Sequence, residues 1–240
     1  MSILRDSPLC GHGKLHDPVC DACLVRDESI CADLNSDELE SLKNRLTHVV
    51  LAREQSLIVE GEPNDSLYII TEGCLRLTKL LADGRRQITG FLFPGDFVGL
   101  MPTKHLPFSD EALSASRACR FSHSGLAQLS EEHPGIKDRL IQSADTELVK
   151  AQDHMMLLGQ KTAMERVASF FTMLSRRTPL GGSHFAVPMS RQDIADYLAI
   201  RLETLSRTVK QLKDDGLVDE LSRTEFSIVD RSRLKSIGMN

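Results

Sequence analysis

Two short amphipathic segments near the C-terminus, residues 190–198 and 202–212, constrain the fold of this chain most strongly. The first begins with Ser190, a residue type that caps helices, and Asp193 stands where a carboxylate returns a hydrogen bond to the cap. The second carries leucine or valine at spacings of three or four residues, which makes one helical face apolar. That face is predicted to bury Leu202, Leu205, Val209 and Leu212. Because Gly216 can end the second helix, the pair predicts a helix-turn-helix.

The opposite face of the second helix is expected to be exposed and polar. In a helix-turn-helix the second helix lies in the major groove of DNA, where arginine pairs with guanine and glutamate accepts from cytosine. We therefore predict DNA contacts from Glu203, Ser206, Arg207 and Lys210, together with Arg191 of the first helix. A plain two-helix corner with a solvated charged face would show the same periodicity. The strands predicted at 217–221 and 225–229 favour a winged helix-turn-helix instead.

The composition is that of a cytoplasmic globular protein, with 240 residues, 41% hydrophobic residues and a net charge of −5. No apolar run approaches the length of about eighteen residues that a membrane helix needs, and we expect neither a secretory signal nor a membrane partner. The acidic total does not oppose DNA binding, because the field that matters is local to the basic residues around the reading helix. Those residues are Arg191, Arg201, Arg207, Lys210, Lys213 and Arg223.

A different pattern occupies residues 36–129, where short apolar runs alternate with turns rich in glycine, proline, asparagine and aspartate. Strands are expected at 66–70, 75–80 and 87–92. Regular spacing of short strands is typical of a double-sheet β-roll or a small barrel. With the helices that follow, the fold class is predicted to be α+β.

Residues 135–160 are expected to form one long helix that carries a heptad seam. The seam consists of Ile141, Ala144, Leu148, Ala151, Met155 and Leu158. Nearly three heptads favour pairing with the same helix of a second copy in a parallel homodimer, and the alternative is a helix that rests on its own domain. A twofold dimer would present two reading helices about 34 Å apart, which suits a palindromic site on double-stranded DNA.

The roll, the long helix and the winged helix-turn-helix together resemble the cyclic-AMP receptor protein and fumarate-nitrate-reduction regulator (CRP/FNR) family of bacterial transcription factors. The likeness covers nearly the whole chain and is most specific at residues 95–99, 157–166 and 203–207. It implies a DNA-binding regulator with four parts. These are a cysteine-rich cluster-binding arm at 1–35, a β-roll sensor domain at 36–134, a dimerisation helix at 135–160 and a winged helix-turn-helix domain at 161–240.

The resemblance also implies a DNA site and a protein partner. The family reads half-sites of the type TTGAT, in which Glu203 would read the cytosine opposite a guanine, Ser206 would contact thymine and Arg207 would hold guanine. Exposed loops of the roll meet RNA polymerase in this family, and the turn at 82–86 is the candidate here. The same turn would look no different without a partner.

Members that bind cyclic nucleotides share a Gly-Glu-Leu followed by Arg-Ser or Arg-Thr, which clamps the cyclic phosphate. This chain has Gly99-Leu100-Met101 instead, and it has no arginine between Arg86 and Arg117. A phosphate without these partners loses the charge-assisted bonds that fix it. We therefore expect no cyclic nucleotide in the roll.

Three of the six cysteines lie within twelve residues, and another follows at the end of the roll. In a reducing compartment such thiols favour metal binding over disulfides, and spacing alone does not separate an iron-sulfur cluster from a structural zinc ion. Gaps of two and then seven residues are similar to those of oxygen-sensing iron-sulfur regulators of nitrogen-fixing and photosynthetic bacteria, whereas the best-known branch has a shorter second gap. The resemblance implies that an oxygen-labile [4Fe-4S] cluster, controlling anaerobic or microaerobic genes, is held by Cys20, Cys23, Cys31 and Cys119.

The remaining candidate ligands have plainer interpretations. Cys74 is expected to be a small buried hydrophobic residue, and Cys10, in the same arm as the cluster ligands, to be a non-ligand. His12 and His16 flank Cys10 and would complete a zinc or haem site, although histidines in a polar arm are more often solvated. A zinc or haem regulator with the same DNA function is therefore the main alternative.

An enzyme finds no support in the sequence, which has no phosphate loop, no Gly-x-Ser-x-Gly elbow and no paired-histidine zinc motif. The histidines of the roll, His48, His105 and His123, are too scattered to suggest the ligand set of a metal-dependent enzyme.

One position in the helix seam bears on how sensing would work. Some oxygen-sensing members carry a carboxylate there, whose repulsion across the twofold axis keeps them monomeric until the cluster is bound. The corresponding place here is Ala151, which brings no charge to the interface. A dimer that persists without the cluster is therefore the second alternative. Cluster loss would then change how the two DNA-binding domains of the dimer are arranged.

Overall fold

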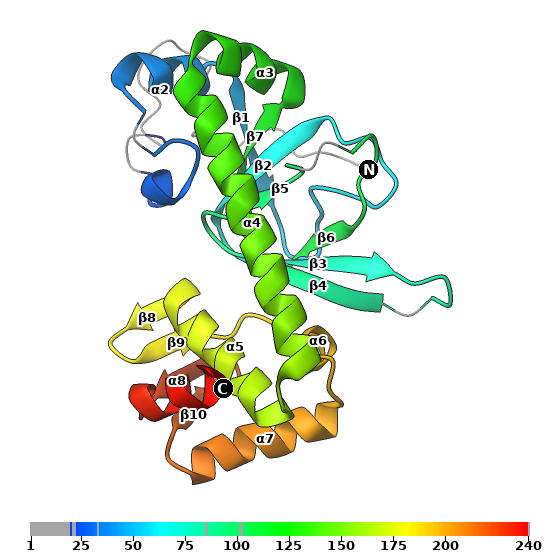
Figure 1. Ribbon diagram of the computed structural model, residues 1–240, viewed down its shortest axis with the longest axis vertical. Coiled ribbons are helices and arrows are strands. Elements are labelled where there is room, and N and C mark those ends of the chain that lie inside the picture. The colour runs from blue at the N-terminus through cyan, green and yellow to red at the C-terminus, as the bar shows by residue number, and fades with distance from the viewer. Residues whose placement is uncertain (1–19, 21–22, 33, 85, 101–102, 240) are drawn as a thin grey trace.

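Two lobes and one long connecting helix make up the protein in the computed structural model (Figure 1). The structure describes residues 20, 23–32, 34–84, 86–100 and 103–239. The long helix, α4 (Pro134–Gln160), runs from the first lobe to the second, and a proline in its first turn suits a helix start. None of the described helices combines the length and the apolar character that crossing a membrane requires.

The first lobe is a roll of two antiparallel sheets, with strand orders β1-β7-β2-β5 and β4-β3-β6. Their bounds are β1 (Leu46–Leu51), β2 (Ser66–Glu72), β3 (Leu75–Leu80), β4 (Arg86–Leu92), β5 (Phe97–Val98), β6 (Ser109–Ala112) and β7 (Ser116–Ser122). The strands predicted at 66–70, 75–80 and 87–92 correspond to β2, β3 and β4. The prediction of an α+β fold with a double-sheet roll is therefore confirmed.

Three short helices and the described arm residues 23–32 pack beside the roll. They are η1 (Arg26–Glu28), α2 (Ser36–Lys43) and α3 (His123–Glu132). Asn35 caps α2 by accepting from the Glu38 N–H at 3.0 Å, while the Glu38 carboxylate accepts from the Asn35 N–H at 2.9 Å. Ile30 of the arm is fully buried in one apolar cluster with Phe97 of β5 and Ile136 of α4. Through Ile30, the described part of the arm thus belongs to the core where the roll meets the long helix.

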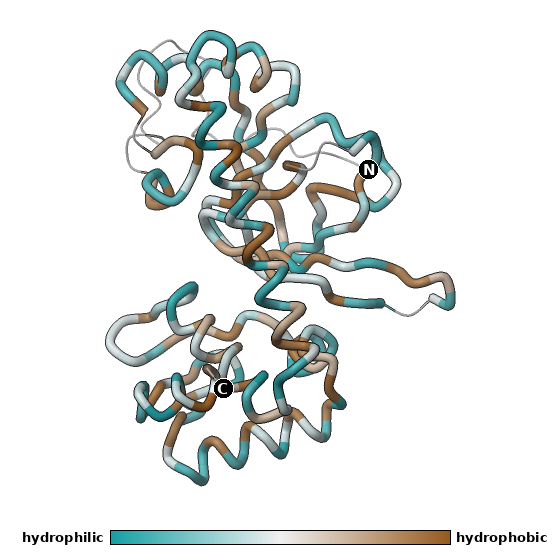
Figure 2. The backbone as a smooth tube through the Cα atoms, in the orientation of Figure 1, coloured by the Kyte–Doolittle hydropathy of each residue, from teal (hydrophilic) through white to brown (hydrophobic). Residues whose placement is uncertain are grey.

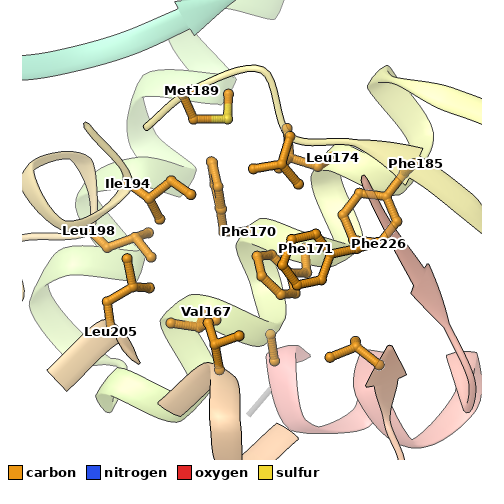
Figure 3. Close-up of a cluster of buried hydrophobic side chains, with 14 of the residues drawn as sticks. Val167, Phe170, Phe171, Leu174, Phe185, Met189, Ile194, Leu198, Leu205 and Phe226 are labelled. Carbon is orange, nitrogen blue, oxygen red and sulfur yellow. The ribbon is translucent and has the colours of Figure 1, made fainter. Parts of the chain in front are cut away.

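The second lobe is helical, with a small sheet of order β10-β11-β9-β8. Its elements are α5 (Ala163–Arg177), β8 (Pro179–Gly181), β9 (His184–Ala186), α6 (Arg191–Tyr197), α7 (Leu202–Asp214), β10 (Val218–Ser222), β11 (Glu225–Ile228) and α8 (Arg231–Met239). Aromatic rings fill its centre, where the Phe171 centroid lies 5.7 Å from that of Phe185 and 5.1 Å from that of Phe226 (Figure 3). The predicted wing strands correspond to β10 and β11, whereas β8 and β9 are too short for their alternation to be recognised in sequence.

Hydrophobic burial continues from the second lobe into the roll. Phe91 of β4 and the adjacent Phe93 belong to the same apolar cluster as Phe170 of α5. The ring centroid of Phe91 lies 6.0 Å from that of Phe170 and 5.2 Å from that of Tyr197 in α6. The two lobes therefore share a core at their junction.

One buried carboxylate organises an edge of the roll. Asp110 of β6 is 1% exposed, and its Oδ1 accepts hydrogen bonds from the N–H groups of Leu57 at 2.7 Å and Ile58 at 3.2 Å. Its Oδ2 is buried and finds no hydrogen-bond partner within the described part of the chain. Burial raises the pKa of Asp110 to about 7, because desolvation disfavours the charged form more than its hydrogen bonds with backbone N–H groups favour it.

We expect protein stability to depend on the protonation of this carboxyl group. Because its pKa is raised in the folded state, its contribution is complete below the ordinary carboxyl pKa of about 4 and is lost as the pH rises through about 7. Asp110→Asn should therefore reduce the fall in urea midpoint between about pH 5 and about pH 8. Asp138→Asn, an exposed change on α4, is the control. Identical pH profiles for the wild type and Asp110→Asn would contradict this role.

Candidate DNA-binding and sensor sites

The first helix of the helix-turn-helix, α6, begins with the predicted capping box. Ser190 Oγ accepts from the backbone N–H of Asp193 at 3.0 Å, and Asp193 Oδ2 accepts from the backbone N–H of Ser190 at 3.2 Å. Each residue thus satisfies a backbone donor that the helix itself leaves unpaired. The prediction made from Ser190 and Asp193 is confirmed.

The turn after α6 contains a left-handed residue. Ala199 has a φ of +50°, and across it the N–H of Ile200 donates to the carbonyl of Ala195 at 3.0 Å. Glycine is the usual residue at such a helix end, because a Cβ destabilises the left-handed conformation. The turn therefore holds a small amount of backbone strain that helical periodicity alone does not reveal.

A single arginine joins this turn to the end of the long helix. The guanidinium of Arg166, on α5, donates to the carbonyl of Leu198 at 2.8 Å and to the carbonyl of Leu158 at 2.8 Å. Its Nε donates to the carbonyl of Lys161 at 2.9 Å. Because these carbonyls belong to the end of α4 and to the turn before α7, Arg166 fixes the position of the turn relative to the long helix.

The second helix, α7, lies at the end of the molecule away from the roll (Figure 1). Hydrophilic and hydrophobic positions alternate along it (Figure 2). Leu205, Val209 and Leu212 are buried, but Leu202 is 38% exposed because it stands in the first turn, so its predicted burial is wrong. The polar residues of the face are all exposed, namely Glu203, Ser206, Arg207 and Lys210.

The charged side chains of the reading face are available to a ligand. Within the described residues, no hydrogen bond or ion pair engages Glu203, Arg207 or Lys210. Ser206 Oγ donates to the Leu202 carbonyl of its own helix at 3.0 Å. The Arg201 side chain at the N-cap of α7 makes no capping hydrogen bond, so the first backbone N–H groups of α7 also remain for an anion such as a DNA phosphate.

Arg191, predicted to contact DNA, makes two contacts within the domain. Its Nη2 lies 2.7 Å from Glu220 Oε1, and its guanidinium lies over the ring of Phe226, 5.1 Å from the centroid. Lys213 pairs with the same Glu220 at 3.0 Å. In this geometry Arg191 joins α6 to the wing strand β10, because that strand brings a carboxylate to the start of α6. Its contact with DNA stays a prediction.

The predicted dimerisation seam forms an open stripe along α4. Ile141, Leu148 and Met155 stand seven residues apart and are 52%, 56% and 64% exposed. Of the other seam positions, Ala144 and Ala151 are exposed and Leu158 is half-buried. A different face of α4, which includes Ile136, Leu140 and Leu157, packs against the chain's own clusters. The helix thus rests on its own protein with one face and leaves the seam uncovered.

Two of the predicted cluster ligands pack against one apolar cluster. Cys31 of the arm and Cys119 of β7 are half-buried beside the cluster that contains Ile30. Burial raises the pKa of the Cys31 thiol more than its hydrogen bond with Ser29 lowers it. The Cys23 N–H donates to the Cys20 carbonyl at 3.4 Å. In the part of the chain that the structure describes, no three His, Cys, Asp or Glu side chains lie close enough together to hold a metal ion.

The fit of these residues to an iron-sulfur cluster is therefore one of donor chemistry, since four cysteine thiolates are its usual ligands. Bringing all four sulfurs to one centre requires another position of the arm over β7. A residue that the sequence did not indicate for this site, His48 of β1, lies beside one of these cysteines. Its Nδ1 is 3.7 Å from the Cys119 Sγ across the β1–β7 pair. Strand pairing brings these residues together, and their separation in sequence gives no sign of it.

The other cysteine and histidine candidates divide between the core and the undescribed part of the chain. Cys74 is buried as predicted, and burial raises the pKa of its thiol well above the usual range. Cys10, His12 and His16 lie outside the described residues. Cys74 is thus a core residue, and it provides a control for experiments on the other thiols.

The turn proposed to meet RNA polymerase, at 82–86, connects β3 to β4. Its last residue, Arg86, does not project freely, because its Nη2 lies 3.0 Å from Asp193 Oδ1 in α6. This contact engages one end of the Arg86 side chain, which is 35% exposed, and the polymerase contact of the turn stays a prediction.

Comparisons with known proteins match both lobes. Residues 48–133 match the cyclic nucleotide-binding domain, and residues 165–237 match the Crp-like helix-turn-helix domain. The chain is 37% identical to the nitrogen fixation regulation protein FixK of Bradyrhizobium diazoefficiens, over 91% of this chain and 93% of the relative. It is 32% identical to the transcriptional activator protein FnrL of Cereibacter sphaeroides, over 90% of both chains. The chain belongs to the CRP/FNR family of transcription regulators.

This CRP/FNR regulator also resembles a solved structure of its family. FixK2 from Bradyrhizobium japonicum has a TM-score of 0.76 and 35% identity, over 80% of this chain and 96% of that one. The relatives are transcription regulators, so the protein is a DNA-binding regulator and not an enzyme, as the sequence predicted.

The left-handed conformation of Ala199 in this CRP/FNR regulator leads to a prediction about stability. Ala199→Gly should raise the free energy of unfolding by about 0.5–1 kcal/mol, because relief of the left-handed Cβ strain exceeds the added entropy of glycine in the unfolded chain. Ala195→Gly, in the buried interior of α6, should lower that free energy by about 1 kcal/mol or more. Both changes are measured by urea unfolding, and destabilisation by Ala199→Gly would contradict the expectation.

Proposed function

We propose that this regulator binds palindromic double-stranded DNA with TTGAT-type half-sites as a homodimer, and that a [4Fe-4S] cluster makes binding responsive to oxygen. The observation that carries the DNA site is the open polar face of α7. Glu203, Ser206 and Arg207 stand exposed near its N-terminal end, the part of a reading helix that meets base edges. Glu203 would accept from cytosine, Ser206 would contact thymine and Arg207 would hold guanine, with Lys210 beside them.

The homodimer is supported by the seam of α4. A second copy of the chain is the occupant that fits it, because the exposed residues Ile141, Leu148 and Met155 repeat at the heptad period. Pairing two copies about a twofold axis also presents two reading helices with the symmetry of a palindrome. Ala151 is exposed within the seam and brings no charge, so the dimer is expected to form with or without a cluster.

The cluster is supported by donor chemistry and by the place of the arm in the core. Cys20, Cys23 and Cys31 would hold it from the arm and Cys119 from the roll. Ile30, next to Cys31, is buried with Ile136 of α4. A change in the position of the arm would therefore alter the packing of the long helix. The cluster, when bound, would supply the oxygen-labile centre, and the protein's own part is to link the arm to the core.

The remaining partners follow from the family and the roll. RNA polymerase is the proposed protein partner, through exposed loops of the roll, among which the turn at 82–86 is the candidate. A cyclic nucleotide is not proposed, because Leu100 stands in place of the expected carboxylate and packs against the apolar cluster of the roll. The cyclic phosphate would find no arginine between Arg86 and Arg117.

Substitution of Arg207 tests the reading face. Arg207→Ala should weaken binding to a TTGAT palindrome by about 1–3 kcal/mol and remove discrimination at one guanine, because the bidentate contact is lost. Titration of labelled duplexes at fixed salt measures both effects. Lys235→Gln, an exposed change on α8 outside the reading helix, is the control. A uniform loss on every sequence, with a salt slope smaller by about one, would mean that Arg207 contacts phosphate.

Anaerobic purification tests the cluster. The protein should show a broad absorption band at about 420 nm and about four irons per chain, and both should be lost in air. Cys119→Ser should lose the iron, whereas Cys74→Ala, which changes a buried core thiol, should retain it. Full iron retention by Cys119→Ser would contradict the ligand assignment. A colourless zinc protein that still binds the palindrome would leave the DNA function and remove the oxygen sensor.

A further inference from the structure

A charged contact that the sequence pattern does not indicate joins the roll to the helix-turn-helix lobe. We call the pair of helices α6 and α7 in this lobe the reading head. Arg76 of β3 and Arg86 of β4 both reach Asp193 of α6, with Arg76 Nη1 at 2.9 Å and Arg86 Nη2 at 3.0 Å from its Oδ1. The side chain of Asp193 is only 3% exposed. Its other oxygen, Oδ2, caps α6 through Ser190. One buried carboxylate therefore both starts α6 and receives two arginines from the roll.

Neighbouring groups extend this contact along α6. Arg86 Nη2 also lies 3.4 Å from Asp196 Oδ2, and Gln87 Nε2 donates to the Asp196 carbonyl at 3.2 Å. Within the roll, Arg76 is oriented by Glu111 at 2.7 Å. We call the cross-lobe set the hairpin clamp, which consists of Arg76, Arg86, Gln87, Asp193 and Asp196.

The hairpin clamp lies beside the aromatic junction of the lobes. The aromatic contacts hold the lobes together, whereas the clamp sets their relative orientation. Rings of Phe91 and Tyr197 lie 5.2 Å apart, and His154 of α4 stacks on Tyr197 at 4.2 Å. Apolar burial holds surfaces together but is non-directional. Charge-assisted hydrogen bonds to a carboxylate depend on angle and distance, so they select one rotation of α6 against the roll.

We propose that the hairpin clamp positions the reading head, so that each dimer presents its two α7 helices at one fixed half-site spacing. The inference rests on the proposed function, binding of a palindrome by a homodimer. Rotation of α6 carries α7 with it, because only a short turn, held by Arg166, separates them. In the structure, where these contacts are formed, α7 lies at the end of the molecule away from the roll (Figure 1). Arg76 and Arg86 are thus positioning residues that do not touch DNA.

A spacing series tests this role in the full-length protein. TTGAT palindromes are prepared with spacers of about two to about six base pairs, and binding of the wild type and Arg86→Gln is compared on each duplex. The wild type should prefer one spacer. Arg86→Gln should bind that duplex about tenfold more weakly and the other duplexes as well as before, because a head that rotates freely is only partly in the competent orientation.

Two control variants separate positioning from loss of structure. Arg86→Lys keeps the charge and should retain most of the spacing preference. Lys79→Gln changes the same hairpin, but Lys79 pairs with Glu60 inside the roll at 3.0 Å, so it should behave like the wild type. Asp193 is left unchanged because it caps α6, and unfolding of Arg86→Gln is followed by circular dichroism.

The outcomes are distinct. Loss of the spacing preference in Arg86→Gln, with wild-type folding and with the preference retained by Lys79→Gln, supports the clamp. An unchanged preference in Arg86→Gln, or an equal loss of affinity on every spacer, overturns it while leaving the proposed function in place. Failure of the wild type to bind any of the palindromes overturns the proposed function and the clamp together.

Discussion

Burial of aromatic side chains at the junction of the two lobes is the interaction on which this architecture depends. Phe170 and Phe171 fill the helical lobe, and Phe91 and Phe93 bring the roll into the same apolar cluster. Because this cluster is continuous, the roll, α4 and the reading head form one packed unit. A DNA-binding domain that contacted only the end of α4 would not change its position when the roll changes.

Charged groups then specify how the joined surfaces are oriented. Asp96, in the turn before β5, is buried and pairs with Lys150 of α4 at 2.6 Å and with Arg177 of α5 at 2.7 Å. Together with Asp193 and Arg166, it links the roll, the long helix and the DNA-binding lobe through directional contacts. Buried charges of this kind are costly when a partner is lost, so they select one arrangement more than they add stability.

Two surfaces are left uncovered by this packing, and both suit recognition. The stripe on α4 is apolar and repeats at the heptad period, whereas the face of α7 is polar and its charged side chains are unpaired within the described residues. An apolar seam fits a second copy, and a polar face with open N–H groups fits DNA. The arm joins these parts through Ile30, which is buried against the long helix.

Sequence by itself determined the local features, because helix caps and apolar stripes depend on residues a few positions apart. The capping box of Ser190 and Asp193, the buried face of α7 beyond Leu202, the wing and the seam of α4 were all predictable in this way. Only the tertiary structure decided which polar side chains meet. Arg191 lies against Glu220, Arg86 against Asp193 and His48 beside Cys119, because strand pairing and lobe packing join residues that are distant in sequence.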